Sequence, residues 1–557
     1  MSFTVHTSRR QFLHSAALMT AGMLLNGCIR RIPTGNLPVA NPQDRAITVD
    51  VHCHIFNGTD LQMAQFIRKA VGTPPECPLV GPAEFGPLLQ DINWLVAPTG
   101  KSELKKLRPG EGDKAHAQRD KIRNASYGKF RSQALASGAT SEQRDALKKN
   151  YQTYLDYQRS KQHAGKDVTL VGGELSAANE YFQYRYVALA DYLHLYNDAS
   201  SRTMDLMIAH LLDYDWPLNN GSPTRTHLDQ QIRLMEQISV LSEGRIHTFA
   251  PFDPFREIAF RAGLDRAKWS PLAMLRKDWV PQRGCIGVKI YPTMGFAPYG
   301  NSQLSPDTWS KAFDWLPDPK NVSYSKGNVA TIGERLDEVL GDLYALCREL
   351  DLPLMAHTDL SNGPSCEFNR FTAADHWQAF RDRFGDLRVN FGHLGGFEDT
   401  AVTDWSMPST PAELNVNACK LVAFMSSDPK AGGRYYGDSA YNQKVLTDRS
   451  GLQAIYKAAL AWQAPGQSQP LLPDRLMYGS DWSLLMLQEN MQTYFADFVT
   501  MYQQLDGPSS ETLSDQFFGG NAVEYLGLRE GPTRRRLLDF YAAHEMSRPT
   551  WMDKIDS

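Results

Sequence analysis

VDVHCHIFN, residues 49–57, has the pattern of a short buried strand that ends in a His-x-His motif. Because successive side chains of a strand point to opposite faces, His52 and His54 share one face and Cys53 lies on the other. Two imidazoles on one side of a strand end can hold one metal ion. Two ordinary histidines would explain an isolated motif of this kind equally well, so its meaning depends on the strands that follow.

Seven more strands are predicted after this one, and helices are predicted between them. The strands are expected at 204–212, 246–251, 285–292, 352–357, 389–393, 434–438 and 475–481, and the helices near 226–243, 336–350, 374–385 and 451–463. A further helix is expected just before the strand at 285–292. Strand–helix alternation repeated eight times predicts an α/β fold, a closed parallel (β/α)8 barrel of the TIM type. A doubly wound open sheet is the alternative, but no GxGxxG turn follows the first strand.

The first and second strands are separated by about 150 residues, although connections in α/β units are normally short. The gap therefore predicts a large helical insertion after strand 1, at about 58–200. Apolar residues recur there at helical spacing, first at Tyr151, Tyr154, Leu155 and Tyr157, then at Tyr181, Tyr184, Val187, Ala188 and Tyr192. The Lys- and Arg-rich stretch 101–166 is either a solvated helix face or a basic arm for anionic ligands.

The N-terminal residues 1–28 have the pattern of an export signal. Residues 8–13, SRRQFL, form a twin-arginine motif, and the short apolar run 16–25 suits a signal core better than a membrane span. The sequence LNGC at 25–28 resembles a lipobox, which predicts lipidation of Cys28; simple cleavage or no cleavage are the alternatives. We therefore expect twin-arginine export to the periplasm, as a free protein or as a lipoprotein tethered to the membrane.

Composition limits the rest of the chain. The protein has 557 residues, a net charge of -4 and 11% aromatic residues, which favours a well-packed globular protein and gives no general field for nucleic acid. Its seven cysteines include no CxxC pair, so no zinc ribbon or disulfide framework is indicated. We expect a linker at 29–46, a barrel domain at 47–530 and a C-terminal helical tail at 531–557. The oligomeric state stays open.

The C-terminal ends of the predicted strands carry metal-ligand and titratable side chains, where barrel enzymes place their active sites. These residues are His52, His54, Lys289, His357, His393 and Asp481. Imidazole and carboxylate groups suit zinc and similar divalent ions. Alone, His357 or His393 would be a structural histidine and Lys289 a salt-bridge partner, but their joint placement at strand ends predicts a metal centre.

The same strand ends resemble the amidohydrolase superfamily of metal-dependent barrels, in particular its amidohydrolase-related branch. The matching motifs are DVHCH at 50–54, LMAH at 354–357, FGHLGG at 391–396, YGSD at 478–481 and GNA at 520–522. The resemblance covers roughly 47–57 and 204–530 and leaves out the insertion.

The resemblance implies a role for each candidate residue. His52, His54, His357 and Asp481 would bind a divalent metal, expected to be zinc. His393 would be either a ligand of a second ion or the acid/base beside a single one. GVKIYP at 287–292 also resembles the strand whose lysine is carbamylated to bridge two metals in dihydroorotase-like members, so Lys289 is a candidate ligand and the ion count is one or two.

This centre predicts hydrolysis of an amide, lactone or ester-like bond in a small-molecule substrate. A bound divalent ion lowers the pKa of water from about 15.7 to about 7. Asp481 would accept the proton of that water and pass it to the leaving group, and His393, if it is not a ligand, would stabilise charge on the substrate oxygen. The alternatives are a metal-dependent non-oxidative decarboxylase of the same branch and a non-catalytic envelope binding lipoprotein.

Overall fold

The computed structural model describes most of the barrel and parts of the other segments. The described residues are 37–38, 46–62, 64–66, 90, 94, 97–107, 181–310, 313, 315, 322–323, 329–397, 417–427, 434–482, 484–488, 490–506 and 512–557. Cys28 and the whole export signal lie outside them, as do most of the linker at 29–46 and residues 108–180 of the insertion. The expectations for these segments stay predictions.

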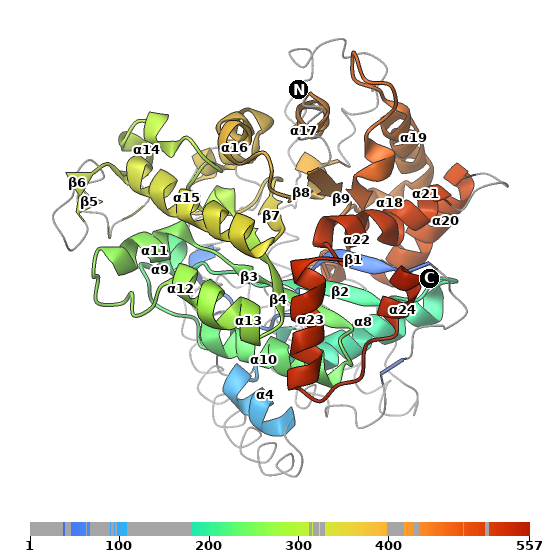
Figure 1. Cartoon of the computed structure of the whole chain (residues 1–557), viewed down its shortest axis with the longest axis horizontal. Helices are drawn as coiled ribbons and strands as arrows, with labels where there is room; N and C mark the ends of the chain where they lie inside the picture. Colours follow the sequence, from blue (N-terminus) through green and yellow to red (C-terminus); the bar gives the residue numbers. More distant parts are fainter. Residues whose placement is uncertain are drawn as a thin grey trace, which may run out of the picture.

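Eight parallel strands form a nearly closed TIM-type barrel (Figure 1), which confirms the predicted fold class. Their order in the sheet is β1 (Val49–Cys53), β2 (Leu206–His210), β3 (Ile246–Pro251), β4 (Cys285–Ile290), β7 (Leu354–His357), β8 (Val389–Gly392), β9 (Tyr435–Asp438) and β10 (Leu476–Met477). Backbone hydrogen bonds also join the two ends of this row, because Val51 N donates to Tyr478 O and Ser480 N donates to His52 O, each over 3.1 Å.

Helices surround the strands and bury their apolar sides against them (Figure 1). The longest, α15 (Ile332–Leu350), begins with a capping box between Thr331 and Glu334 and buries an apolar stripe that includes Leu336 and Leu343. The other predicted helices are present as α10 (Leu228–Leu241), α16 (Gln378–Phe384) and α19 (Arg449–Ala461). The helix expected before the strand at 285–292 is present as a series of short helices that begins with α11 (Pro254–Arg261), and α17 (Asn417–Ser426) occurs where none was predicted.

Strand β1 contains an irregularity that the sequence did not predict. Asp50 pairs with Met207 and Cys53 pairs with Ala209, so three residues of β1 advance against two of β2. This extra residue is a β-bulge, which re-aims the side chains that follow it. Val51 packs in the apolar barrel interior, while His52 next to it already contacts the polar groups at the strand ends.

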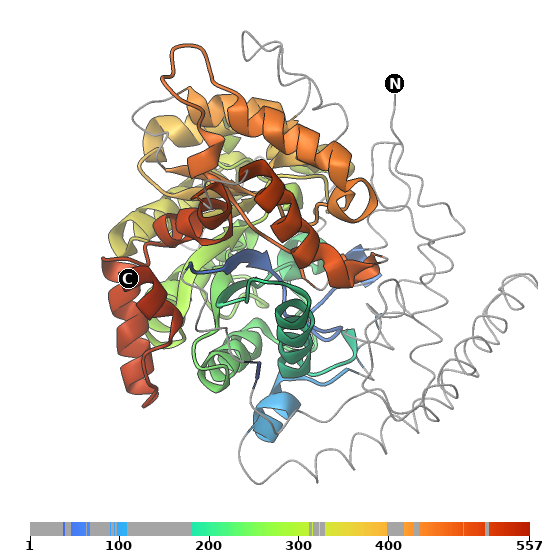
Figure 2. The same ribbon diagram turned by 90° about the vertical axis from the view of Figure 1, so that its right-hand side faces the viewer.

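The C-terminal tail closes the barrel at the N-terminal ends of the strands. Helices α22 (Asn521–Leu526), α23 (Pro532–Ala543) and α24 (Trp551–Asp556) share one apolar cluster with the barrel interior. Tyr525 Oη donates to Leu354 O at the start of β7 (2.7 Å), and Trp551 Nε1 donates to Gly244 O just before β3 (2.9 Å). Figure 2 shows these red helices on one side of the strands.

The described ends of the insertion are helical and are tied to each other. They are α4 (Gly100–Leu107) and α8 (Arg185–Ala199). The buried guanidinium of Arg185 contacts two buried carboxylates, with Nε 2.7 Å from Asp60 Oδ2 and Nη1 3.0 Å from Glu103 Oε2. This ion cluster joins the loop after β1, α4 and α8. The helical insertion as a whole remains a prediction, because residues 108–180 are outside the described part.

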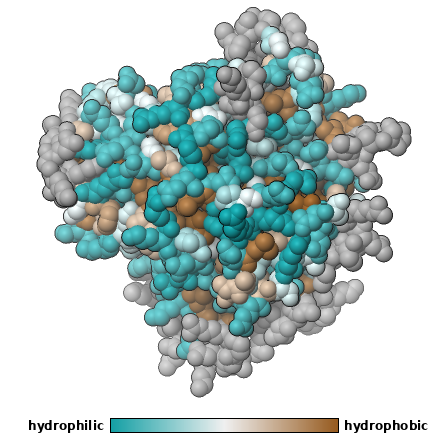
Figure 3. Space-filling model, in the orientation of Figure 1, coloured by the Kyte–Doolittle hydropathy of each residue, from teal (hydrophilic) through white to brown (hydrophobic). Residues whose placement is uncertain are grey.

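The surface gives no sign of a membrane-spanning element among the described residues, where no helix has both the length and the apolar character needed to cross a bilayer. The face shown in Figure 3 is largely hydrophilic, with smaller apolar areas between polar side chains. The more exposed large apolar side chains of the described chain are Leu241, Phe260, Leu264, Leu360 and Leu538.

Candidate metal centre

The candidate site residues lie buried at the C-terminal end of the barrel. They are His52, His54, Lys289, His357, His393 and Asp481. The Nε2 atoms of His54 and His52 lie 3.2 Å and 3.7 Å from Asp481 Oδ1. The ring of His393 lies 4.7 Å from that of His52 and 4.8 Å from that of His357. Ligand atoms of His52, His393 and Asp481 all lie within 4.8 Å of one another, close enough to share one ion.

Lys289 lies beside this group. Its Nζ is 5.3 Å from the centroid of the Tyr291 ring, which stacks on His357 with a centroid distance of 4.3 Å. The ammonium group donates to Met355 Sδ over 2.6 Å. Burial lowers the pKa of Lys289 to about 7, although the charges of Asp438 and Asp481 oppose this shift. The amine is therefore partly neutral near pH 7.

Outer hydrogen bonds fix the histidine rings so that Nε2 is the free nitrogen. His54 Nδ1 lies 2.8 Å from His210 O, and His393 Nδ1 lies 3.0 Å from Ala440 O. Because a carbonyl oxygen only accepts, Nδ1 must carry the hydrogen, which leaves the lone pair on Nε2 when the ring is neutral. His52 Nδ1 likewise lies 3.1 Å from a carboxylate oxygen of Asp438. This is how proteins orient metal-ligating histidines.

The free nitrogens are buried without a protein partner. Among the described residues, no group hydrogen-bonds to Nε2 of His52 or of His357. Burial lowers the pKa of both rings well below 6.5, and the charges of Lys289 and His393 add to this effect. Neutral imidazoles with unshared lone pairs are the ligand form of histidine. The residues present therefore fit a divalent cation.

Asp481 supplies the negative charge. Burial alone would raise the pKa of its carboxyl, but the contacts with the surrounding imidazoles, first that of His54 and then that of His393, outweigh burial and hold the pKa below its ordinary value of 3.8. Asp481 is therefore ionised at neutral pH. Among ligand-type residues, a carboxylate beside neutral imidazoles is the donor set that zinc prefers.

The backbone is strained where it presents these side chains. His393 has φ 62° and Asp481 has φ 55°, both in the left-handed region that few non-glycine residues adopt. Gly479 permits the close approach of the β10 extension to β1, since a Cβ there would lie 3.0 Å from His52 Cβ. Such strain persists only where the surroundings hold it, and it gathers at functional sites.

Asp438, at the end of β9, is a site residue that the sequence analysis missed. Besides His52 Nδ1, it accepts from His393 N (2.9 Å) and from Asn390 Nδ2 (2.7 Å). It therefore orients two candidate ligands at once. The sequence did hold a signal, because Asp438 ends the strand predicted at 434–438, but a lone strand-end carboxylate has no motif around it.

His210, at the end of β2, was also missed and has a supporting position. Its ring lies 5.1 Å from that of His52, and its Nε2 donates to Val51 O over 2.7 Å. Its own carbonyl oxygen accepts from His54 Nδ1. His210 thus orients the His-x-His pair from the neighbouring strand.

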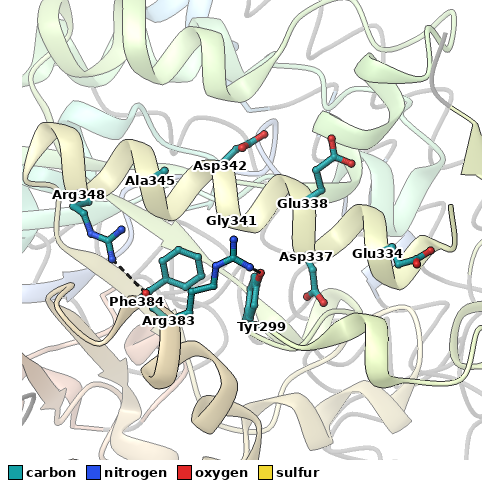
Figure 4. A pocket seen from close by; sticks show the side chains of 10 residues that line it. All are labelled: Tyr299, Glu334, Asp337, Glu338, Gly341, Asp342, Ala345, Arg348, Arg383 and Phe384. Carbon is teal, nitrogen blue, oxygen red and sulfur yellow. Dashed lines mark hydrogen bonds between the residues drawn. The ribbon is translucent and has the colours of Figure 1, made fainter. Parts of the chain in front are cut away.

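A surface hollow on the outer side of α15 is separate from this site. Figure 4 shows the residues that line it: Tyr299, Glu334, Asp337, Glu338, Gly341, Asp342, Ala345, Arg348, Arg383 and Phe384. Its charged groups are paired with neighbours, as in the contacts of Arg348 with Asp386 and of Arg383 with Tyr299. None of the candidate ligands faces it.

Residues 279–528 match the family model described as amidohydrolase. The match covers somewhat less than half of the chain, so this part of the chain is similar to the amidohydrolase family. The matched segment contains Lys289, His357, His393 and Asp481, whereas His52 and His54 lie before it and are placed beside them by the fold. No curated protein sequence matches the chain.

Several solved structures resemble this chain at low identity. An uncharacterized TIM-barrel protein from Bordetella bronchiseptica shares 13% identity over 67% of this chain and 91% of its own, with a TM-score of 0.35. An amidohydrolase from Burkholderia multivorans shares 15% over 61% and 91%, with a TM-score of 0.33. A 5-carboxyvanillate decarboxylase from Sphingomonas paucimobilis shares 13% over 58% and 79%, with a TM-score of 0.29. The likeness to the amidohydrolase family lies in the matched segment 279–528.

Proposed function

We propose that this protein is a metal-dependent hydrolase that cleaves an amide, lactone or ester-like bond of a small molecule. One observation carries the proposal. The buried Nε2 atoms of His52 and His357 have no hydrogen-bond partner among the described residues, Asp438 orients the ring of His52 through Nδ1, and the ionised Asp481 lies beside them. The match of residues 279–528 to the amidohydrolase family model supports the same interpretation.

His52, His54, His357 and Asp481 would hold the ion, which we propose to be zinc because its donors are imidazole nitrogens and a carboxylate oxygen. A divalent ion bound there lowers the pKa of water from about 15.7 to about 7 and polarises a substrate carbonyl. His393 and Lys289 are the further ligands available if a second ion is bound.

Asp481 is the proton carrier of the reaction. Its depressed pKa leaves Oδ1 ionised and able to accept a proton from the attacking water. The same oxygen then returns the proton to the leaving nitrogen or oxygen. Because the barrel end is buried, the exchange takes place with little competition from bulk water.

The orientation of the His393 ring limits the roles that its Nε2 atom can have. With Nδ1 donating to Ala440 O, the neutral ring has only a lone pair at Nε2. It can then bind a cation or accept a proton, but it can donate to a substrate oxygen only when it is protonated. His393 is therefore either a ligand or an acid/base, and the number of bound ions separates the two roles.

A substrate screen on metal-loaded protein tests this function. We expect elemental analysis to find one or two divalent ions per chain, and a panel of lactones, amides and esters to yield acid plus amine or alcohol. A chelator should abolish that activity, and added zinc should restore it. Release of carbon dioxide from carboxylated substrates would instead identify a decarboxylase. A protein that retains no metal after incubation with zinc would contradict both enzymatic proposals.

A further inference from the structure

We propose that Tyr192 of α8 is a positioning residue for the metal centre, acting through Asp50 and Ser480. The inference rests on the proposed function, because it concerns how the candidate ligands are held. It also assigns a role to a described end of the insertion, which contributes no ligand of its own.

Asp50 joins the two segments that carry the candidate ligands. Its Oδ1 accepts from His52 N (3.0 Å) and from Ser480 N (3.1 Å). Its Oδ2 accepts from Ser480 Oγ and from Tyr192 Oη, the latter over 2.7 Å. One fully buried carboxylate thus connects β1, the extension of β10 and α8.

Ser480 transmits this contact to Asp481. Its hydroxyl donates to Asp50 and accepts from Trp482 N over 3.0 Å, so it fixes the residues on both sides of Asp481. Asp481 N also donates to His52 O (2.7 Å), and His54 N donates to Trp482 O (3.1 Å). A shift of Ser480 would therefore move Asp481 against both histidines of the His-x-His motif.

Tyr192 is the donor that comes from outside the barrel. Its ring packs edge-to-face on Trp482, with centroids 5.0 Å apart, and on Tyr196, with centroids 4.8 Å apart. These contacts fix the hydroxyl against Asp50. Without it, Ser480 Oγ is the remaining donor to Asp50 Oδ2, and a buried carboxylate that loses a donor draws its other donors into new positions.

Tyr196 offers a matched control on the same helix. It is equally buried, it touches the same Trp482 ring, and its hydroxyl donates to Met491 O over 3.2 Å rather than to Asp50. Tyr196→Phe therefore removes the same atom from the same aromatic cluster without touching the carboxylate that links the ligand segments.

The experiment compares wild type, Tyr192→Phe and Tyr196→Phe for zinc affinity, measured by competition with a chromophoric chelator. The visible spectrum of the cobalt-loaded proteins and the melting temperature of the metal-free proteins are recorded beside it. We expect Tyr192→Phe to weaken zinc binding about 10-fold, the lower end of the usual effect of losing an outer partner of metal ligands, because Tyr192 acts through Asp50 and Ser480, and to alter the cobalt bands. Tyr196→Phe should keep the wild-type affinity and spectrum.

Equal zinc affinity and equal cobalt spectra for all three proteins would overturn the positioning role while leaving the hydrolase proposal intact. A wild-type protein that binds neither metal would contradict the proposed function itself. If Tyr192→Phe does not fold, Ser480→Ala replaces it, since it removes the other hydroxyl on Asp50 Oδ2. That variant must then show the loss of affinity, and a wild-type affinity would overturn the inference.

Discussion

The two ends of the barrel differ in how their buried groups are packed and hydrogen-bonded. At the C-terminal end, imidazole nitrogens of His52 and His357 are buried without a partner in the described part of the chain, and His393 and Asp481 have positive φ. At the N-terminal end, apolar helices close the barrel, and the buried Trp551 places its indole N–H on a carbonyl oxygen. Unpartnered groups and strained backbone cost stability, whereas apolar burial and satisfied donors provide it.

The difference separates stability from activity along one set of strands. At the C-terminal end, the unpartnered nitrogens that could bind a metal lower the stability of the fold. The apolar packing of the tail helices at the N-terminal end compensates for that loss. Variants at the two ends should therefore change different observables, which makes the comparison testable.

The largest effect is expected from His52→Ala combined with His54→Ala. Loss of the bound ion leaves water with its ordinary pKa, so activity on the identified substrate should fall by on the order of 10⁴ or more. The metal-free variant should be close in stability to the metal-free wild type, because the lost hydrogen bonds of His52 to Asp438 and of His54 to His210 O are offset by removal of the unpartnered buried Nε2 of His52. Kinetics of zinc-loaded protein and urea unfolding of metal-free protein measure the two quantities.

One result of this experiment would contradict the proposed difference between the two ends of the barrel. A double variant that unfolds at lower urea concentration than the metal-free wild type would show that the histidines stabilise the fold. The C-terminal end would then not be a region where stability is given up for function.

The next largest effect is a pH dependence of the free energy of unfolding, and it arises at the N-terminal end of the barrel. His247 in β3 is buried, its Nε2 lies 2.6 Å from Tyr541 Oη of α23, and burial lowers its pKa to about 4. The unfolded chain takes up the proton near pH 6.5, before the folded one, so stability is present above pH 6.5 and falls as pH drops from 6.5 to 4. The loss should reach about 3 kcal/mol.

His247→Gln isolates this contribution. The variant should lack that part of the fall in unfolding free energy between pH 7 and pH 4, as measured by urea unfolding at fixed pH, while its zinc affinity at pH 7 stays at the wild-type value. Parallel pH profiles for the two proteins would show that His247 does not titrate in this range.

The sequence predicted the barrel because parallel strands buried on both faces read as apolar runs with helical segments between them. Even the weak pattern at 434–438 corresponds to β9 (Tyr435–Asp438). The bulge in β1 could not be predicted, because its extra residue is defined only by pairing with β2. A helix was predicted before β4, but its division into several short helices was not, since they lack a long apolar stripe.

The candidate site was predictable where motifs mark it and not where contacts are remote. The six candidate residues each end a strand or its extension, and the barrel brings such ends together. Asp438 and His210 have no surrounding motif, and the Tyr192–Asp50 hydrogen bond joins residues 142 positions apart. Only the fold reveals partners of that kind.

The smallest effect is expected from Asp438→Asn. The carboxylate holds His52 Nδ1 and His393 N in place from the end of β9. An amide at this position lacks the charge that makes Nε2 of His52 a stronger donor to a cation, so zinc affinity should fall about 10–100-fold. The measurement is the same chelator competition, with the unfolding free energy of the metal-free protein recorded beside it.

Asp205→Asn is the matched control at the opposite end. This buried carboxylate accepts from Thr48 N and from Lys554 Nζ of α24, each over 2.9 Å, so its loss should reduce stability and leave zinc affinity unchanged. Asp438→Asn should show the reverse. If both variants lost affinity and stability together, the two ends of the barrel would be energetically coupled, and the separation of roles drawn from their different packing would be wrong.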